Sequence, residues 1–152
     1  MLDPFNQTNL YELNDYFFDL KDLFDNNKLP NKILFSGPKG TGKSTLSLHL
    51  INYILSKKED FPYDIDNLKI NEKNRSFNLI KNNSSPNFYF INVKKDKKFI
   101  EINQIRELIN FCNKSSFNDL PRFILIDNIE MMNLNSSNSL LKILEEPNHN
   151  IN

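Results

Sequence analysis

The chain has 152 residues, with 19 basic and 19 acidic side chains, a net charge of zero, one Cys and no Trp. A neutral chain lacks the basic surface that binds nucleic acid electrostatically, and a single Cys excludes a disulfide framework and suits a reducing compartment. No apolar run approaches the roughly 20 residues that cross a membrane, so we expect a cytoplasmic protein with no membrane partner. The length suits one domain.

The first part of the chain predicts a helix, a strand and a second helix. Apolar residues recur at three- and four-residue spacing over residues 8–27, which predicts an amphipathic helix capped by Asn6 or Thr8. Residues 32–36 form a short apolar run typical of a buried strand. Residues 43–57 have little polar face, which predicts a helix buried on two sides.

The later part of the chain alternates between strand and helix patterns. Residues 58–86 are polar and weakly patterned, so we expect a surface connection with a short helix near residues 66–69. After this connection the pattern predicts strand, helix, strand and helix at residues 88–91, 102–112, 122–127 and 136–146. Strands that alternate with helices indicate an α/β fold with a parallel sheet, here of three strands.

All three glycines of the chain lie in the run Gly37-Pro-Lys-Gly-Thr-Gly-Lys43-Ser44. This run matches the phosphate-binding loop pattern G-x-x-x-x-G-K-[ST], and it follows a predicted strand and opens a predicted helix. Glycines allow backbone N–H groups to approach phosphate oxygens, and the N-terminus of the helix favours an anion. We therefore predict that the nucleotide-binding residues are Gly37, Pro38, Lys39, Gly40, Thr41, Gly42, Lys43, Ser44 and Thr45.

The same pattern predicts how ATP and Mg²⁺ bind. Lys43 is expected to reach the β- and γ-phosphates, and the Ser44 hydroxyl is expected to bind Mg²⁺. The apolar run at residues 123–126 ends in Asp127, which a parallel sheet places at its carboxyl edge, near the loop. Such an Asp holds Mg²⁺ in proteins with this loop. We therefore predict ATP and Mg²⁺ as cofactors, with Ser44 and Asp127 as metal ligands.

Hydrolysis is less well supported than binding. Many ATPases of this type have a Glu directly after the metal-binding Asp, where it orients the attacking water, but this chain has Asn128. An amide cannot act as a general base. Glu130 lies two residues further on, and we interpret it as a solvated loop residue. The sequence therefore predicts no catalytic residue and leaves enzymatic activity open, with hydrolysis weak or absent.

Three stretches resemble bacterial clamp-loader modules of the AAA+ family, at residues 29–44, 105–109 and 139–147. The last stretch, Ser-Leu-Leu-Lys-Ile-Leu-Glu-Glu-Pro, is the most specific of the three. Together the similarities run from about Tyr11 to Pro147, and they are closest to the delta-prime type of DNA polymerase III subunit. The resemblance implies a three-layer P-loop NTPase fold and a role in DNA replication.

The resemblance also implies partners and a domain plan. A clamp loader is a hetero-oligomer with gamma/tau and delta subunits, and it opens the sliding clamp and places it on primed DNA. Another strand is due after the last helix, so we expect residues 1–152 to be an incomplete N-terminal AAA+ domain that lacks the later strands and lid. Its expected parts are a leading helix (1–30), strand, loop and helix (31–57), the variable connection (58–86) and strand-helix-strand-helix (87–152).

Two departures from the family pattern favour the delta-prime type over the gamma/tau type. Gamma/tau subunits, and many delta-prime subunits, have a four-Cys zinc module, whereas residues 58–86 contain neither Cys nor His, so no zinc site is expected there. Gamma/tau subunits also have an acidic pair where this chain has Asp127 and Asn128. Both departures fit a stator, a subunit that supports the ATP site of a neighbour.

Two alternatives stay open. An active gamma/tau-type motor predicts ATP hydrolysis in the assembled complex that depends on Lys43. A P-loop small-molecule kinase needs a site for the acceptor, and residues 58–86 offer no recognisable anchor.

The remaining reactive side chains have structural interpretations. Cys112 lies on the apolar side of its helix and is interpreted as a small buried side chain. His49 and His149 have no partner cluster, so no metal or catalytic role is expected for them. The lysines of residues 94–98 are interpreted as a solvated turn, with contact to DNA phosphates as the alternative.

Overall fold

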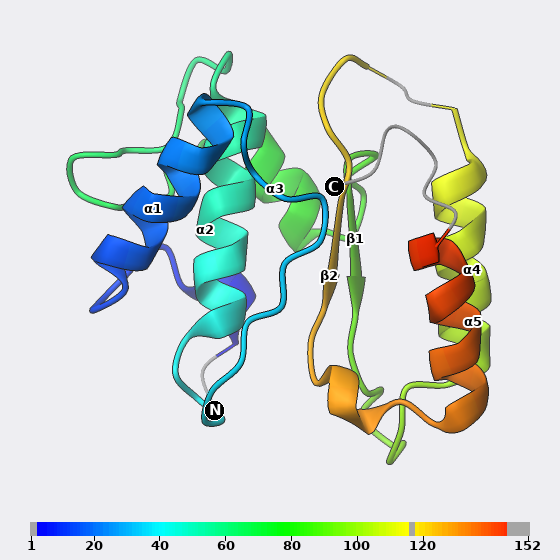
Figure 1. Ribbon diagram of the computed structural model, residues 1–152. Helices are drawn as coiled ribbons and strands as arrows, with labels where there is room; N and C mark the ends of the chain where they lie inside the picture. Colours follow the sequence, from blue (N-terminus) through cyan, green and yellow to red (C-terminus); the bar gives the residue numbers. More distant parts are fainter. Residues whose placement is uncertain (1–2, 116–117, 146–152) are drawn as a thin grey trace. The chain divides into compact units, whose positions relative to one another are not determined.

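The computed structural model describes residues 3–115 and 118–145 (Figure 1). The chain divides into two compact units, Met1–Ser85 and Pro86–Asn152. Within the described residues, no helix is long and apolar enough to cross a membrane.

The first unit is helical. A short 3-10 helix, η1 (Pro4–Asn6), precedes α1 (Asn14–Asp25), α2 (Lys43–Ser56) and α3 (Arg75–Lys81). Helix α2 is buried at every position over residues 46–56, and α1, α3 and η1 pack against it. The predicted buried helix is therefore confirmed, and its near-continuous apolar sequence is the reason, because few of its positions suit solvent.

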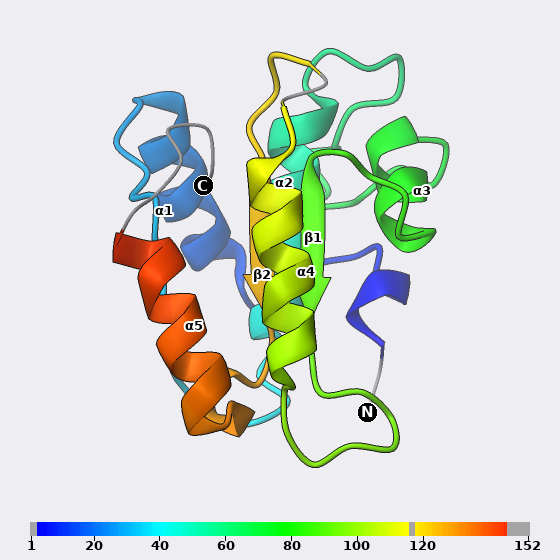
Figure 2. The same ribbon diagram turned by 90° about the vertical axis from the view of Figure 1, so that its right-hand side faces the viewer.

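The second unit is α/β, as the alternating pattern predicts. Its elements are β1 (Phe88–Ile91), α4 (Ile102–Asn113), β2 (Phe123–Ile126), η2 (Ile129–Met131) and α5 (Leu134–Glu145). The strands pair in parallel, and both helices lie on the same side of them (Figures 1 and 2). Between the strands and helices lies an apolar cluster made of Ile91, Ile100, Ile105, Leu108, Cys112 and Leu140.

Two interpretations of this unit are confirmed. Cys112 is buried. Residues 94–98 are exposed, with a turn in which Lys97 N donates to Lys94 O at 2.9 Å. Glu146, Pro147 and His149 lie outside the described residues.

The predicted strand at residues 32–36 is wrong for the described part of the chain. The segment joins no β-ladder there, so the sheet has two strands rather than three. Ile33 and Leu34 are 40% and 76% exposed, although the apolar run indicates burial. A strand is defined by the neighbour that it pairs with, and local apolarity cannot supply that neighbour.

The helix predicted near residues 66–69 is also wrong. These residues belong to a turn that Asp64 and Lys69 close, with reciprocal backbone N–O distances of 2.9 Å. The helix of this connection, α3, lies further along the chain. Its N-cap is Asn74, whose side chain accepts from Phe77 N at 2.8 Å. The signal was an Asn directly before a short amphipathic segment.

The predicted caps of the first helix are wrong as well. Helix α1 begins later than expected, and its N-cap is Leu13, which has no side-chain capping bond. Asn6 belongs to η1, while the backbone oxygen of Thr8 accepts from Ile70 N at 2.8 Å. The N-terminal segment therefore runs beside the connection instead of starting the helix.

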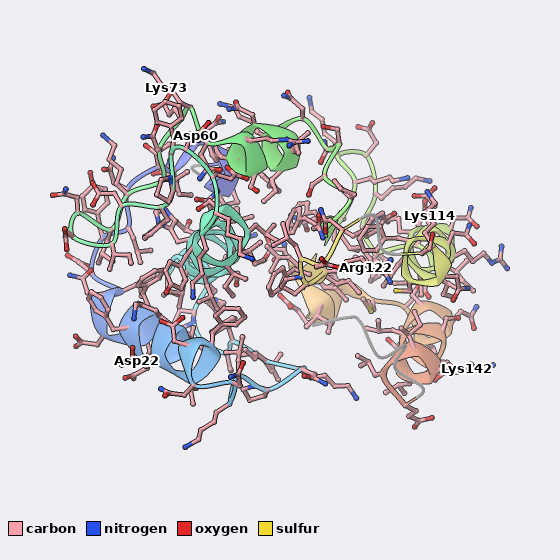
Figure 3. All side chains as sticks on the ribbon, turned by 90° about the horizontal axis from the view of Figure 1, so that it is seen from above. Asp22, Asp60, Lys73, Lys114, Arg122 and Lys142 are labelled. Carbon is pink, nitrogen blue, oxygen red and sulfur yellow. The ribbon has the colours of Figure 1, made fainter. Side chains whose placement is uncertain are left out.

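A buried arginine bonds to the carbonyl groups at the C-terminal end of α4. Arg122 is 5% exposed, and its Nη1 donates to the carbonyl oxygens of Phe111 and Lys114, both at 2.9 Å. Its Nη2 donates to the carbonyl oxygen of Cys112 at 2.9 Å. Figure 3 labels Lys114, the C-cap of α4, and Arg122, which directly precedes β2. A cation is favoured there because the last carbonyl groups of a helix lack partners and carry partial negative charge.

We expect Arg122→Leu to lower the free energy of unfolding by about 2 kcal/mol, because three charge-assisted bonds to carbonyl groups are lost. The matched control is Arg106→Leu, since Arg106 is exposed on α4 and its Nη1 donates to the exposed Asn103 Oδ1. Urea unfolding of both variants makes the comparison. Equal stability of the two variants would contradict this account of the helix end.

His49 predicts a pH dependence of stability. Its Nε2 donates to Gln7 O at 3.1 Å, and its Nδ1 accepts from Tyr63 Oη–H at 2.8 Å, so the buried ring is held neutral. Burial lowers the pKa of His49 from 6.5 to about 4. The unfolded chain therefore binds a proton between pH 6.5 and 4 that the folded chain does not bind.

We expect the free energy of unfolding to fall as the pH drops through this window, by up to about 3 kcal/mol. Denaturant titrations at pH 7 and pH 4.5 measure the fall, and His49→Gln should remove this contribution to it. The contribution of His149, the other His of the chain, is measured with His149→Gln. If the free energy of unfolding of His49→Gln falls between pH 7 and pH 4.5 as much as that of the unaltered protein, His49 is not the group responsible.

Candidate nucleotide-binding site

The glycine-rich loop adopts a backbone that needs glycine at its end. Gly42 has φ 80°, and it directly precedes α2 as its N-cap. A Cβ atom built on Gly42 would lie 2.9 Å from Leu13 Cδ1, the movable end of a side chain, so it is the positive φ that disfavours a side chain here. Gly40 has φ 87° and meets the same conformational requirement. These glycines let the chain turn tightly into the helix.

Lys43 folds back over the loop. Its Nζ donates to the carbonyl oxygens of Gly37 and Pro38, at 3.0 and 2.6 Å, and lies 3.4 Å from Thr41 Oγ1. Thr41 Oγ1 in turn donates to Pro38 O at 3.0 Å. The loop thus curls around one ammonium group, which places a positive charge at the centre of the glycine-rich segment.

The first turn of α2 adds backbone donors to this charge. The first hydrogen bond of the helix runs from Leu46 N to Gly42 O at 2.8 Å, so the N–H groups of Lys43, Ser44 and Thr45 precede the helical ladder. Such N–H groups point out of the helix end and suit an anion. The structure therefore brings together, within one unit, the loop, the lysine and the helix N-terminus that the motif predicts.

Asp127 lies at the carboxyl end of β2 in the second unit. Its backbone N donates to Ile91 O at 2.9 Å, which continues the ladder past the strand. Its Oδ2 accepts from Asn92 Nδ2 at 3.2 Å, and its Oδ1 accepts from Asn128 N at 3.1 Å. None of the ion pairs found among the described residues includes Asp127.

Asn128 has a conformation and a partner that explain its residue type. It lies in the left-handed region, with φ 55° and ψ 48°, which Asn tolerates better than most residues. Its Nδ2 donates to Asn92 Oδ1 at 2.9 Å. Glu130 is exposed in η2, which agrees with its interpretation as a solvated residue. Asn92 was not predicted from the sequence, although a polar residue directly after an apolar strand is a usable signal.

The donor chemistry fits magnesium bound together with a nucleotide. Hydroxyl and carboxylate oxygens are the groups that Mg²⁺ accepts, and it usually keeps waters and substrate phosphate oxygens as further ligands. Within the described residues, no group of three or more His, Cys, Asp or Glu side chains is placed to hold a metal. Ser44 belongs to the first unit and Asp127 to the second, and each is described within its own unit.

Comparisons with known proteins agree with the motifs. The family model described as DNA polymerase III, delta subunit, matches residues 14–152. The chain belongs to this family. It is 27% identical over 114 residues to DNA polymerase III subunit delta' of Pseudomonas aeruginosa. The aligned stretch covers 75% of this chain and 33% of that protein.

A second relative points to the same type of subunit. The chain is 30% identical over 129 residues to DNA polymerase III subunit delta' of Bacillus subtilis strain 168, which covers 85% of this chain and 36% of that protein. The chain thus spans about a third of the length of the curated relatives that it matches. The delta-prime resemblance is confirmed.

We expect Asn128→Glu to lower the free energy of unfolding by about 1–2 kcal/mol, because it loses the bond to Asn92 and adopts the left-handed region less readily. Asn128→Gly keeps the backbone conformation and loses only the side-chain bond, so its cost should be smaller. Thermal unfolding of both variants tests this order of stability. A Glu variant as stable as the Gly variant would contradict it.

Proposed function

We propose that the chain is the nucleotide-binding part of a delta-prime-like clamp-loader subunit, which binds ATP with Mg²⁺ and helps to load the sliding clamp onto primed DNA. The observation that carries the proposal is the loop at residues 37–44, which curls around Lys43 and ends at the N-terminus of α2. Gamma/tau and delta subunits are the proposed partners. The activity and partners of the whole protein are part of this proposal.

The loop suggests how the phosphates bind. Lys43 Nζ is already held by the carbonyl oxygens of Gly37 and Pro38, so phosphate oxygens need only replace these acceptors. The N–H groups of the first turn of α2 donate to the same anion, and the dipole of the helix adds to the attraction. Binding therefore needs little rearrangement of the protein, which reduces its entropic cost.

The proposed metal ligands follow from the motif. The Ser44 hydroxyl and the Asp127 carboxylate are the oxygen donors that we assign to Mg²⁺. When it is bound with the nucleotide, Mg²⁺ neutralises charge on the β- and γ-phosphate oxygens. Asn92 and Asn128 hold the Asp127 carboxylate, so its orientation is set before any metal arrives.

We propose that this subunit hydrolyses ATP weakly or not at all. The position after Asp127 has no carboxylate, and the side-chain amide of Asn128 is bonded to Asn92. Without a general base, the attacking water lacks the group that orients it. A subunit that binds ATP without turning it over suits a stator, which supports the ATP site of a neighbouring subunit.

The test compares ATP binding with ATP turnover in the whole protein. We expect Lys43→Ala to weaken Mg-ATP binding at least tenfold, because a charge-assisted contact to phosphate is lost. Lys28→Ala is the matched control, since Lys28 is exposed and lies outside the loop. Calorimetry gives the affinities, and phosphate release gives the turnover, which should stay at background in the isolated subunit.

Three outcomes would contradict the proposal, the first at the nucleotide site and the other two at the stator role. Unchanged affinity in Lys43→Ala would overturn the nucleotide site. Strong hydrolysis by the isolated subunit, without DNA and abolished by Lys43→Ala, would overturn the stator role and favour a gamma/tau-type motor. Hydrolysis in the assembled complex that depends on Lys43 of this subunit would favour the same motor.

A further inference from the structure

A polar cluster of Asn92, Asp127 and Asn128 lies at the carboxyl ends of β1 and β2. The last register pair of the ladder joins Ile91 to Ile126, so Asn92 and Asp127 are the next residues on neighbouring strands. Residues in register on parallel strands project toward the same face of the sheet. The pairing therefore places the two side chains next to each other, with Asn92 Nδ2 3.2 Å from Asp127 Oδ2.

The orientation of the Asn92 amide is fixed by its other contacts. Its Oδ1 accepts from Val93 N at 2.6 Å and from Asn128 Nδ2 at 2.9 Å. A flipped amide would turn its NH₂ group toward these two donors and would present only an acceptor to Asp127. The network therefore requires that the NH₂ group of Asn92 faces the carboxylate.

The backbone of Asn92 is held as firmly as its side chain. Its carbonyl oxygen accepts from Gln104 Nε2 at 2.8 Å, and Gln104 is 6% exposed on α4. Gln104 Oε1 in turn accepts from Glu101 N at 3.1 Å, as part of the capping box of α4. Asn92 therefore links the first turn of α4 to the carboxylate at the end of β2.

The Asp127 carboxylate is oriented by hydrogen bonds and can still accept further partners. Its two oxygens each accept one of the bonds described, from Asn92 Nδ2 and from Asn128 N. A carboxylate has about four acceptor positions, so capacity remains on both oxygens for a cation. Partners of this kind orient metal ligands in proteins, and losing one typically costs 10–100-fold in metal affinity or activity.

We propose that Asn92 is a positioning residue for Asp127, which fixes the rotamer of the carboxylate that binds Mg²⁺ with ATP. The proposal rests on the proposed role of Asp127 as a metal ligand. Asn128 is part of the same hydrogen-bond network, because its amide holds Asn92 in the orientation that donates to Asp127. The same bond explains why an amide, rather than a carboxylate, occupies the position after the metal ligand.

The test measures ATP affinity of the whole protein with Mg²⁺ and with EDTA, for Asn92→Ala, Asp127→Ala and the double variant. We expect Asn92→Ala to weaken Mg-ATP binding about tenfold and to leave binding in EDTA unchanged. The double variant should match Asp127→Ala, because Asn92 acts only through that carboxylate. Asn110→Ala is the control, since Asn110 is exposed on α4.

The outcomes separate this proposal from the proposed function. If Asp127→Ala leaves the Mg²⁺ dependence unchanged, the metal role of Asp127 fails, and the role of Asn92 fails with it. If Asp127→Ala removes the dependence while Asn92→Ala has no effect, only the positioning role is overturned. An equal loss in Mg²⁺ and in EDTA, or additive losses in the double variant, would show a merely structural role and overturn it too.

A second variant keeps the test usable if Asn92→Ala does not fold. Asn128→Gly retains the left-handed backbone and the N–H group that donates to Asp127, and it removes only the side-chain donor to Asn92. We expect it to weaken Mg-ATP binding about threefold, with EDTA binding unchanged. Full Mg²⁺ dependence in Asn128→Gly would contradict the part of the proposal that assigns Asn128 to holding Asn92.

Discussion

The burial of α2 is the constraint on which the first unit depends. Residues 46–56 are all buried, so the helix has no freedom to rotate or slide, and its N-terminus is fixed where the loop ends. Gly42, the N-cap of the helix, takes the positive φ of 80° that lets the loop turn into the helix at this point. A loop anchored in this way can keep its backbone donors and Lys43 in place without a ligand to organise them.

Polar groups inside this unit tie the rest of the chain to α2. Asn52 and Asn74 exchange side-chain bonds at 3.2 and 3.3 Å, and His49 bonds both Tyr63 and the backbone of Gln7. Buried polar groups that are fully paired specify one arrangement, because an unpaired group is costly in an apolar interior. The polar connection after α2 is thus attached to the helix that carries the loop.

Local patterns predicted most of the helices and both strands of the second unit, because periodicity reports which face of an element is buried. Residues 32–36 show the limit, since their apolar run contains no information about a pairing partner. Asn74 and Arg122 show another limit, because a cap on a helix and a cation at a helix end depend on contacts that spacing alone does not reveal.

The nucleotide motif was visible in the sequence, whereas the pairing of Asp127 with Asn92 was not. The spacing of the loop residues is local, so one short run of sequence predicts the loop, the lysine and the helix start together. Asn92 lies 35 residues before Asp127, and only the register of two parallel strands brings them together. The same register brings Asn92 close to Asn128, whose side-chain amide donates to Asn92 Oδ1, and this bond explains the amide at position 128.

We propose above all that the loop before α2 binds the phosphates of a nucleotide. The most direct measurement follows the backbone amide resonances of the whole protein by NMR during titration with Mg-ATP and, separately, with adenosine. We expect phosphate-dependent shifts that concentrate at Gly40, Gly42, Lys43 and Ser44, with little change there when adenosine is added. Equal shifts with both ligands, or shifts that avoid the loop, would contradict it.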